Sequence, residues 1–200
     1  MKTFKFIPVL FLLALLFSAC EREENHRLLE SRALELGTQI SDSTQKMLAG
    51  NLKKAIAGGG VFHAIEYCNL EAIPITRKME EKYGVKIKRT SLKVRNPQDR
   101  PDENERRLLM HFDSLAAAGA PMTPAIRWLD DDHILYARPI MLNNGLCLSC
   151  HGEIGSAVSD SLYAFIRSKY PEDRATGYKL NDFRGMWSIV FDEEQLEKAD

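Results

Sequence analysis

This sequence has almost no net charge and no internal repeats. Lys and Arg number 27, Asp and Glu number 28, and the formal net charge is −1. Proteins that bind nucleic acid concentrate Lys and Arg on one face, and no such cluster stands out here, so nucleic acid is not an expected partner. No repeat of about 20–50 residues recurs, which excludes a solenoid or propeller. The length suits one domain with a hydrophobic core.

Residues that ligate metals are also few, because the chain has only four Cys and five His. A structural zinc site usually takes its ligands from two closely spaced pairs. The chain has one C-x-x-C pair, and no second C-x-x-C or H-x₃₋₅-H sequence accompanies it. A zinc finger or zinc ribbon is therefore excluded.

The one C-x-x-C pair that is present continues into a histidine, as Cys147–Leu148–Ser149–Cys150–His151. This spacing is the attachment signature of a c-type haem, in which both thiols form thioethers and the histidine ligates the iron. A disulfide or a thioredoxin-type redox pair is the alternative. A redox pair would sit where a strand meets a helix, whereas the turn-forming residues 142–145 precede this motif. The motif predicts haem c as the cofactor, provided that the chain is exported.

The N-terminus supplies a short apolar run, residues 6–17, which is too short to span a bilayer as a permanent helix. Two lysines precede it, and small residues followed by Cys20 end it, which is typical of a bacterial lipoprotein signal peptide with lipid on the Cys20 thiol. An ordinary secretory signal peptide is the alternative. Glu21 is not the Asp that signals inner-membrane retention, which favours the outer membrane. We predict a lipid anchor on the periplasmic side of a bacterial membrane, with the divisions 1–19 (signal peptide), 20–30 (tether) and 31–200 (domain).

Two helices are predicted next. Apolar residues recur every three or four positions over residues 27–57, and Gly58–Gly59–Gly60 ends this long leading helix. A second helix over residues 61–82 is interrupted at Pro74. Its apolar face includes Cys68, a thiol that neither the lipid nor the haem motif uses. Spacing alone favours a small buried side chain for Cys68, and the second axial ligand of the iron is the alternative.

Residues 85–95 alternate as a strand, and the alternation changes phase after Arg89, which indicates either a bulge or a strand that crosses from one packing environment to another. Arg89 shares a face with Val85 and Ile87 and therefore points inward. Arg138 shares parity with the apolar residues of a later strand and is a second inward arginine. A buried arginine needs an anionic partner, which two haem propionates or a nearby acidic side chain would supply.

The rest of the chain alternates short helices and strands. Asp102 and Glu105 form a capping box at the start of a helix. Together the elements predict an α+β fold in which helices cover one side of an antiparallel sheet. The later elements are strands over 125–130 and 133–142, a helix over 158–169, a strand over 186–191 and an acidic tail that frays.

Several short motifs, read together, resemble the periplasmic PAS-like c-type haem domains, which occur alone or as sensor regions of bacterial signalling proteins. The resemblance spans residues 60–192. The motifs are Y-C-N at 67–69, R-T-S-x-x-x-R-N-P at 89–97, R-P-D at 100–102, A-R-P-I at 137–140, C-x-x-C-H-G at 147–152, G-Y at 177–178 and N-D-F-R-G at 181–185.

The resemblance implies a PAS-like antiparallel sheet with flanking helices. It also implies that the helix cysteine, here Cys68, ligates the iron opposite His151. Met141, Met186 and His63 are the alternative ligands at this position.

A haem-based redox or gas sensor that signals to a separate protein is the function we expect first. A thiolate opposite histidine stabilises ferric iron, and a bond that breaks on reduction would open a site for a gas. A membrane-tethered mono-haem electron-transfer cytochrome c is the alternative. A peroxidase needs a positioned acid–base pair, which the helix around Cys68 lacks, so we do not expect an enzyme.

Overall fold

The computed structural model describes the backbone of residues 7–198, and side chains from residue 22 onward. Five α-helices, four strands and one 3₁₀ helix occur in this part of the chain. In order they are α1 (Ile7–Tyr83), β1 (Lys86–Thr90), η1 (Pro97–Asp99), α2 (Glu103–Ala117), β2 (Ala125–Trp128), β3 (His133–Met141), α3 (Gly145–His151), α4 (Asp160–Lys169), β4 (Phe183–Asp192) and α5 (Glu193–Glu197).

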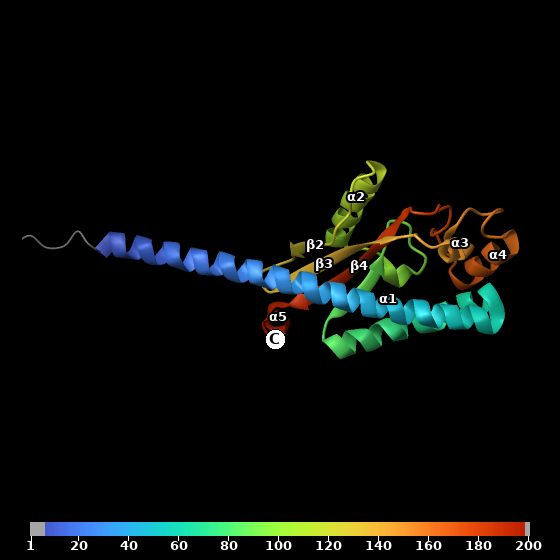
Figure 1. Cartoon of the computed structure of the whole chain (residues 1–200), viewed down its shortest axis with the longest axis horizontal. Helices are drawn as coiled ribbons and strands as arrows, with labels where there is room; N and C mark the ends of the chain where they lie inside the picture. Colours follow the sequence, from blue (N-terminus) through green and yellow to red (C-terminus); the bar gives the residue numbers. More distant parts are fainter. Residues whose placement is uncertain (1–6, 199–200) are drawn as a thin grey trace, which may run out of the picture.

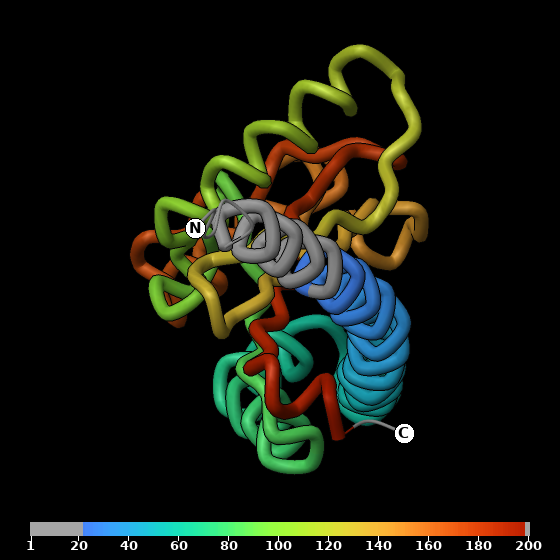
Figure 2. Tube along the Cα trace, turned by 90° about the vertical axis from the view of Figure 1, so that its left-hand side faces the viewer, coloured from blue at the N-terminus to red at the C-terminus, as the bar shows by residue number. Residues whose placement is uncertain are grey.

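Helix α1 is a hairpin of two helical arms. Gly59 and Gly60 have non-helical backbone angles, and Gly60 has φ 74° and ψ −170°, a region that only glycine adopts readily. The second arm, residues 61–83, therefore turns back along the first (Figures 1 and 2). The predicted end of the leading helix in this glycine run is confirmed. Pro74, in contrast, lies inside the second arm and does not interrupt it.

The first arm packs on the domain from further upstream than the predicted boundary at residue 31. Leu29 is fully buried in the main core, so the packed part of the chain includes much of the predicted tether. Gly37 allows this arm to approach the sheet closely at Tyr136. A Cβ atom at Gly37 would lie 2.4 Å from the ring of Tyr136, so any other residue would push the helix away.

The sheet is antiparallel throughout, with the strand order β1-β4-β3-β2. Strand β1 ends at Thr90, so the strand predicted over residues 85–95 is too long. The phase change after Arg89 reflects the end of the strand and not a bulge within it. The bulge in this sheet instead falls between β3 and β4, at Ile140 and Met141.

Helices cover both faces of the sheet, and the prediction of helices on one side is wrong. Trp187 and Ile189 of β4 face α1 in the main core, whereas Met186 faces the other way and packs against Leu109 and Phe112 of α2. Figure 1 shows α1 and α2 on opposite sides of the sheet. Strand residues alternate in this manner because successive side chains point to opposite faces.

A local signal begins α2, whereas burial of an apolar side chain accounts for α5. Asp102 and Glu105 form the predicted capping box of α2, with both reciprocal bonds at 2.8 Å. The acidic tail, predicted to fray, instead forms α5, because Leu196 is fully buried in the main core.

The predicted signal peptide and Cys20, the predicted site of lipid attachment, lie outside the residues whose side chains are described. Among the residues that are described, no helix is both long and apolar enough to cross a membrane.

Candidate haem-binding site

A cavity of about 760 Å³ lies between the two arms of α1, the sheet and α3. Its volume falls in the range of roughly 300–1,000 Å³ that is usual for ligand pockets. Apolar side chains from three directions line much of it. They are Leu48, Leu52 and Ile56 of the first arm, Ile65 and Ala72 of the second arm, and Ile87 and Ile140 of the sheet.

Helix α3 carries the C-x-x-C-H motif to this cavity. Asn144 begins the helix, because its side-chain oxygen accepts a hydrogen bond from the backbone N–H of Leu146 at 2.9 Å. Cys147 and Cys150 are one helical turn apart and share a face, and both line the cavity with His151. The two thiols are not joined in a disulfide. Burial raises the pKa of the Cys150 thiol, and the nearby charge of Arg95 opposes this shift.

The imidazole of His151 is held by the loop that follows α4. Its Nδ1 lies 2.7 Å from the carbonyl oxygen of Ala175, so Nδ1 carries the proton and donates it to that oxygen. This arrangement leaves Nε2 with a free lone pair, which is the state that a metal ligand requires. Burial, reinforced by the positive charges of Arg184 and Arg95, lowers the pKa of His151 well below its usual value.

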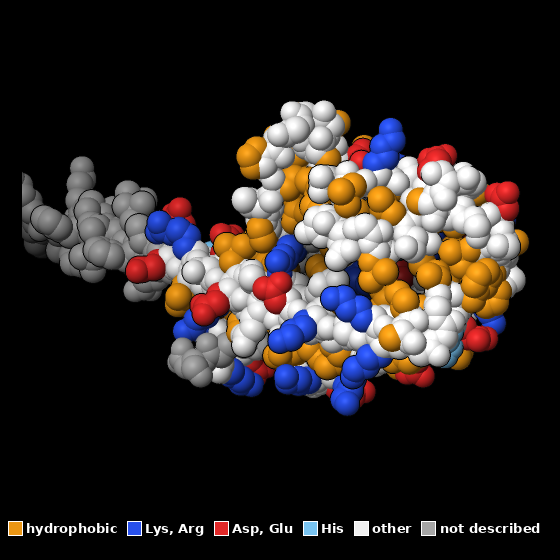
Figure 3. Space-filling view, turned by 45° about the vertical axis from the view of Figure 1, so that its right-hand side comes forward, with side chains coloured by type: hydrophobic (Ala, Val, Ile, Leu, Met, Phe, Trp, Pro, Cys, Tyr) orange, Lys and Arg blue, Asp and Glu red, His pale blue; other side chains and the backbone are white. Residues whose placement is uncertain are grey.

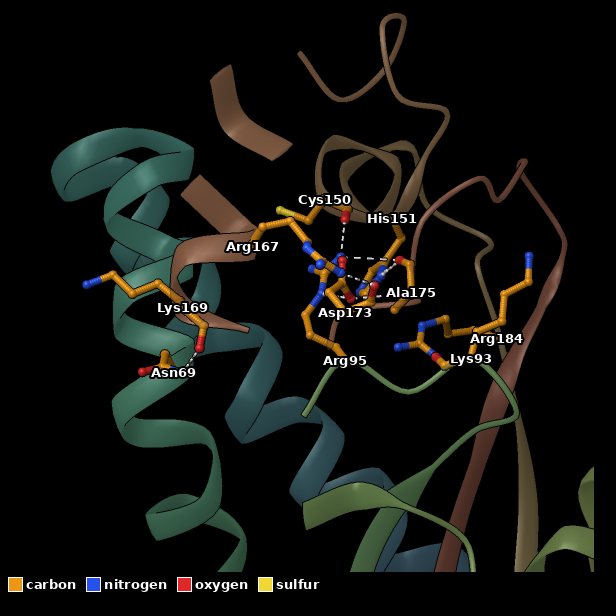
Figure 4. Close-up of polar contacts among 10 residues, drawn as sticks. All are labelled: Asn69, Lys93, Arg95, Cys150, His151, Arg167, Lys169, Asp173, Ala175 and Arg184. Carbon is orange, nitrogen blue, oxygen red and sulfur yellow. Dashed lines mark hydrogen bonds and ion pairs between the residues drawn. The ribbon is translucent and has the colours of Figure 1, made fainter. Parts of the chain in front are cut away.

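Arg95 fastens α3 to the same loop, a role that the sequence did not reveal. Its Nε donates to Asp173 at 3.0 Å, and its Nη2 donates to the carbonyl oxygens of Cys150 at 2.6 Å and Ala175 at 3.2 Å (Figure 4). Asp173 is buried, and the ion pair with Arg95 satisfies its charge. The R-T-S-x-x-x-R-N-P motif includes Arg95 and was the only sequence feature that pointed to it. Arg95 follows the end of β1, so strand alternation does not predict the direction of its side chain.

Cys68 reaches the cavity from a different element, the second arm of α1. It is half-buried, is not bonded to another cysteine, and lines the cavity with the three residues of α3. Burial raises the pKa of the Cys68 thiol, and the charges of Arg89 and Arg95 oppose the shift. A side chain that lines a cavity is not fully packed in the core, so this position does not favour the interpretation of Cys68 as a small buried side chain.

Arg89 also lines the cavity, on the sheet face shared with Ile87 as its parity predicted, but it is exposed and not buried as Ile87 is. Its guanidinium carbon lies 5.6 Å from the centre of the Trp187 ring, a cation–π contact. Among the described residues, no carboxylate forms an ion pair with it. Because Arg89 is exposed, burial does not by itself require an anionic partner at this position, and the acidic residue Asp99 lines the same cavity.

Arg138 does not line the cavity, and its predicted contact with a haem propionate is not supported. Its Nη1 lies 2.5 Å from Asp42 and 3.0 Å from the hydroxyl of Ser41, both on the first arm of α1. The residue does point toward α1, as its parity predicted. The carboxylate of Asp42 therefore balances the charge of Arg138, as a propionate was predicted to do.

A third arginine, Arg184, enters the cavity because of the bulge in β4. Ile140 pairs with Gly185 and Met141 pairs with Phe183, which leaves Arg184 as the extra residue. A bulge redirects the side chain at that point, and this register cannot be read from the sequence of one strand. Gly185 is required beside it, because its φ is 155°.

Hydrogen bonds from the neighbouring loop hold Arg184 in place. The hydroxyl of Ser91 donates to the carbonyl oxygen of Arg184 at 2.7 Å, and Nη1 of Arg184 donates to the carbonyl oxygen of Lys93 at 3.1 Å. Burial lowers the pKa of Arg184, and the charges of Arg95 and Arg89 act in the same direction. Arg89, Arg95 and Arg184 thus concentrate positive charge in one region of a cavity whose lining also includes apolar side chains and acidic residues such as Asp99 and Glu105.

The alternative iron ligands separate clearly. Met186 is buried under α2 on the other face of the sheet, and His63 is exposed and outside the cavity. Met141 and Cys68 both line it. Within the described residues, no three His, Cys, Asp or Glu side chains gather closely enough to hold a bare metal ion. Two thiols, an imidazole, apolar walls and a cationic region instead suit a large apolar ring with carboxylate substituents, as haem is.

Comparisons with known proteins agree with this description. The model of the Tll0287-like family matches residues 22–191, which include every cavity residue named above. Among solved structures, the chain is similar to the crystal structure of the cyanobacterial haem protein Tll0287, with 25% identity and a TM-score of 0.57. The alignment covers 79% of this chain and 94% of that chain, and it confirms the α+β PAS-like fold. A search of curated proteins found no match. The chain belongs to the Tll0287-like family.

Proposed function

We propose that this protein binds one haem c covalently, through thioethers to Cys147 and Cys150, with Nε2 of His151 as an axial ligand. The observation that carries the proposal is the convergence of these three residues of α3 on one apolar cavity, with Nδ1 of His151 already bonded to Ala175. The family match supports it, because the similar cyanobacterial protein is described as a haem protein.

The remaining cavity residues have roles that follow from their chemistry. Arg89 and Arg184 would pair with the propionates, because arginine binds carboxylates with two parallel hydrogen bonds. The apolar side chains of α1 and the sheet would exclude water from the ring. Arg95 would keep α3 fixed against the loop at Ala175 and so hold the imidazole in one orientation.

Cys68 is the ligand that we propose opposite His151, because it lines the same cavity from another element. A bound haem supplies one-electron redox chemistry and, when an axial position is open, a site for a diatomic gas. Cys68 lies about two helical turns beyond the hinge at Gly59 and Gly60, so its attachment or release acts on the second arm of α1. This position favours a redox or gas sensor that signals to a partner protein, rather than an enzyme.

The alternative is electron transfer by a membrane-tethered mono-haem cytochrome, which the rigid hold on His151 by Ala175 favours. Carbon monoxide separates the two functions. A sensor that releases Cys68 on reduction would bind carbon monoxide in its reduced form, and a cytochrome that keeps both ligands would not.

The proposed cellular location follows from the N-terminal sequence alone. Lipid on Cys20 would hold the domain on the periplasmic side of a bacterial membrane, with the outer membrane favoured. Replacement of Cys20 by Ala should move the exported protein from the membrane fraction to the soluble fraction. An unchanged distribution would rule out this anchor.

Haem staining of a denaturing gel tests the central proposal. The wild-type band should stain, and the double variant Cys147→Ala and Cys150→Ala should not, because covalent attachment survives denaturation. The exposed change Met110→Ala on α2 is the control that should stain like wild type. Staining that persists in the double variant would refute covalent attachment at these residues.

A further inference from the structure

A second cavity lies on the other side of Arg95 from the haem-binding cavity. Its volume is about 440 Å³, and Val94 and Arg95 line both cavities. The second cavity combines apolar and cationic walls, with Leu92 and Val94 on the apolar side. Nothing in the proposed haem chemistry uses it.

The charges around this second cavity do not balance. Arg100 forms an ion pair with Glu172, and Arg95 forms one with Asp173. Arg167 and Arg174 also line the cavity, and no ion pair to either of them is found among the described residues. Arg167 and Arg174 are both exposed, and the one hydrogen bond of the Arg167 guanidinium among the described residues goes to the uncharged backbone oxygen of Asp173, at 3.4 Å. Two positive charges therefore remain beside an apolar wall.

Arg95 connects this excess charge to the haem motif. Its Nη2 bonds the carbonyl oxygens of Cys150 and Ala175, and the Ala175 oxygen also accepts the proton of His151 (Figure 4). Nη1 of Arg95 makes no hydrogen bond within the described residues, since the bonds to Asp173 come from Nε and Nη2. An anion in the second cavity would attract Arg95 and compete with the carbonyl oxygen that orients His151.

We propose that the second cavity binds a small dicarboxylate, and that Arg95 transmits its binding to His151. Arg167 and Arg174 would each pair with one carboxylate, and the aliphatic body would lie against Leu92 and Val94. The binding step is independent of the haem proposal. The transmission step rests on it, because it requires His151 to ligate a haem.

Isothermal titration of the full-length, haem-loaded protein with succinate tests the binding step at constant ionic strength. Wild type should bind succinate and should not bind its uncharged analogue succinamide. The changes Arg174→Gln and Arg167→Gln should each raise the dissociation constant about tenfold, the usual loss for one charge-assisted hydrogen bond. Arg174→Lys should lose less, because it keeps the charge. Arg107→Gln on α2, where Arg107 pairs with Glu103, is the matched control and should bind like wild type.

Equal dissociation constants in all of these proteins, or equal heats for succinamide, would overturn the binding step. The transmission step is read from the ferric Soret band, which should shift in wild type as succinate saturates and should not shift in Arg174→Gln. Succinate that binds with no spectral change would overturn transmission and leave binding intact. If the purified protein proves to carry no covalent haem, the proposed function is refuted. Succinate binding by that protein would still support the second cavity as a dicarboxylate site.

Discussion

His151 and Cys68 are placed in one cavity by contacts of different strength. His151 has a hydrogen bond from Nδ1 to Ala175 and a neighbouring carbonyl held by Arg95, whereas the Cys68 thiol makes no hydrogen bond or disulfide within the described part of the chain. A ligand that is held by its backbone alone exchanges more readily than one fixed by a second bond. The two sides of the proposed haem therefore differ in the freedom of their ligands, which suits a switch on the Cys68 side.

Replacement of Cys68 by Ser should shift the ferric Soret band and raise the reduction potential, because a thiolate stabilises ferric iron. We expect a rise of about 100 mV or more, since axial ligands set haem potentials over roughly 0.8 V. Low-temperature electron paramagnetic resonance of the ferric protein should change in parallel. Thr76→Ser, on the same arm and in the same cavity, is the control. Identical spectra for Cys68→Ser and wild type would exclude Cys68 as the ligand.

Asp173 should contribute to stability far more than an exposed acid. Its side chain is fully buried in the pair with Arg95, and it also accepts the backbone N–H of Ala175 at 3.0 Å. Asp173→Asn leaves Arg95 without its counter-charge and should cost about 3 kcal/mol of unfolding free energy. Glu103→Gln, which breaks the exposed pair with Arg107, should cost under about 1 kcal/mol in the same urea titration. Similar losses for both variants would contradict this assignment.

Individual residues were predictable to different degrees. The chemistry proposed for Cys147, Cys150 and His151 follows from their spacing alone, and parity predicted the direction of Arg89. Arg184 could not be found this way, because its direction depends on a bulge that exists only when β3 pairs with β4. For Arg138 the direction of the side chain was predictable, but its binding partner was not, because Asp42 lies on a distant helix.

The hinge of α1 decides how the second arm, and with it Cys68, lies against the sheet. Gly60 adopts φ 74° and ψ −170°, which a side chain makes costly, whereas Gly58 is helical and a Cβ there would meet nothing within 4 Å. Gly60→Ala should therefore lower the unfolding free energy by about 1–3 kcal/mol. Gly58→Ala should leave it unchanged or raise it by about 0.5–1 kcal/mol. Thermal denaturation of both variants, monitored by circular dichroism, measures the difference, and a reversed order would contradict the hinge geometry.

Most elements were predictable because local signals mark their ends. The glycine run and the capping box of α2 both act within a few residues. The errors occurred where packing outweighs local preference. Pro74 remains inside a helix that packs against the domain, and α5 forms because Leu196 reaches the main core. The strand over 85–95 was predicted too long because alternation continued past the last paired residue, Thr90.

The whole molecule places a long helical hairpin on one face of the sheet, α2 on the other, and α3 with α4 at the far end (Figure 1). The face seen in Figure 3 carries hydrophobic side chains toward this far end and basic side chains nearer its middle. Phe62 and Phe165 meet at that end, with ring centres 5.2 Å apart. The α+β class could be predicted from the order of elements. The covering of both faces could not, because it depends on which side of β4 each helix meets.

Peptide mass spectrometry of the protein, purified from a host that matures c-type cytochromes, tests the account most directly. Trypsin should leave residues 128–167 as one peptide that ends at Arg167, because the one internal arginine, Arg138, precedes a proline and the peptide contains no lysine. This peptide contains Cys147 and Cys150 but not Cys68. Covalent haem c predicts the mass of the peptide plus one haem, with neither thiol open to alkylation. A peptide of unmodified mass, with both thiols alkylated, would contradict the account.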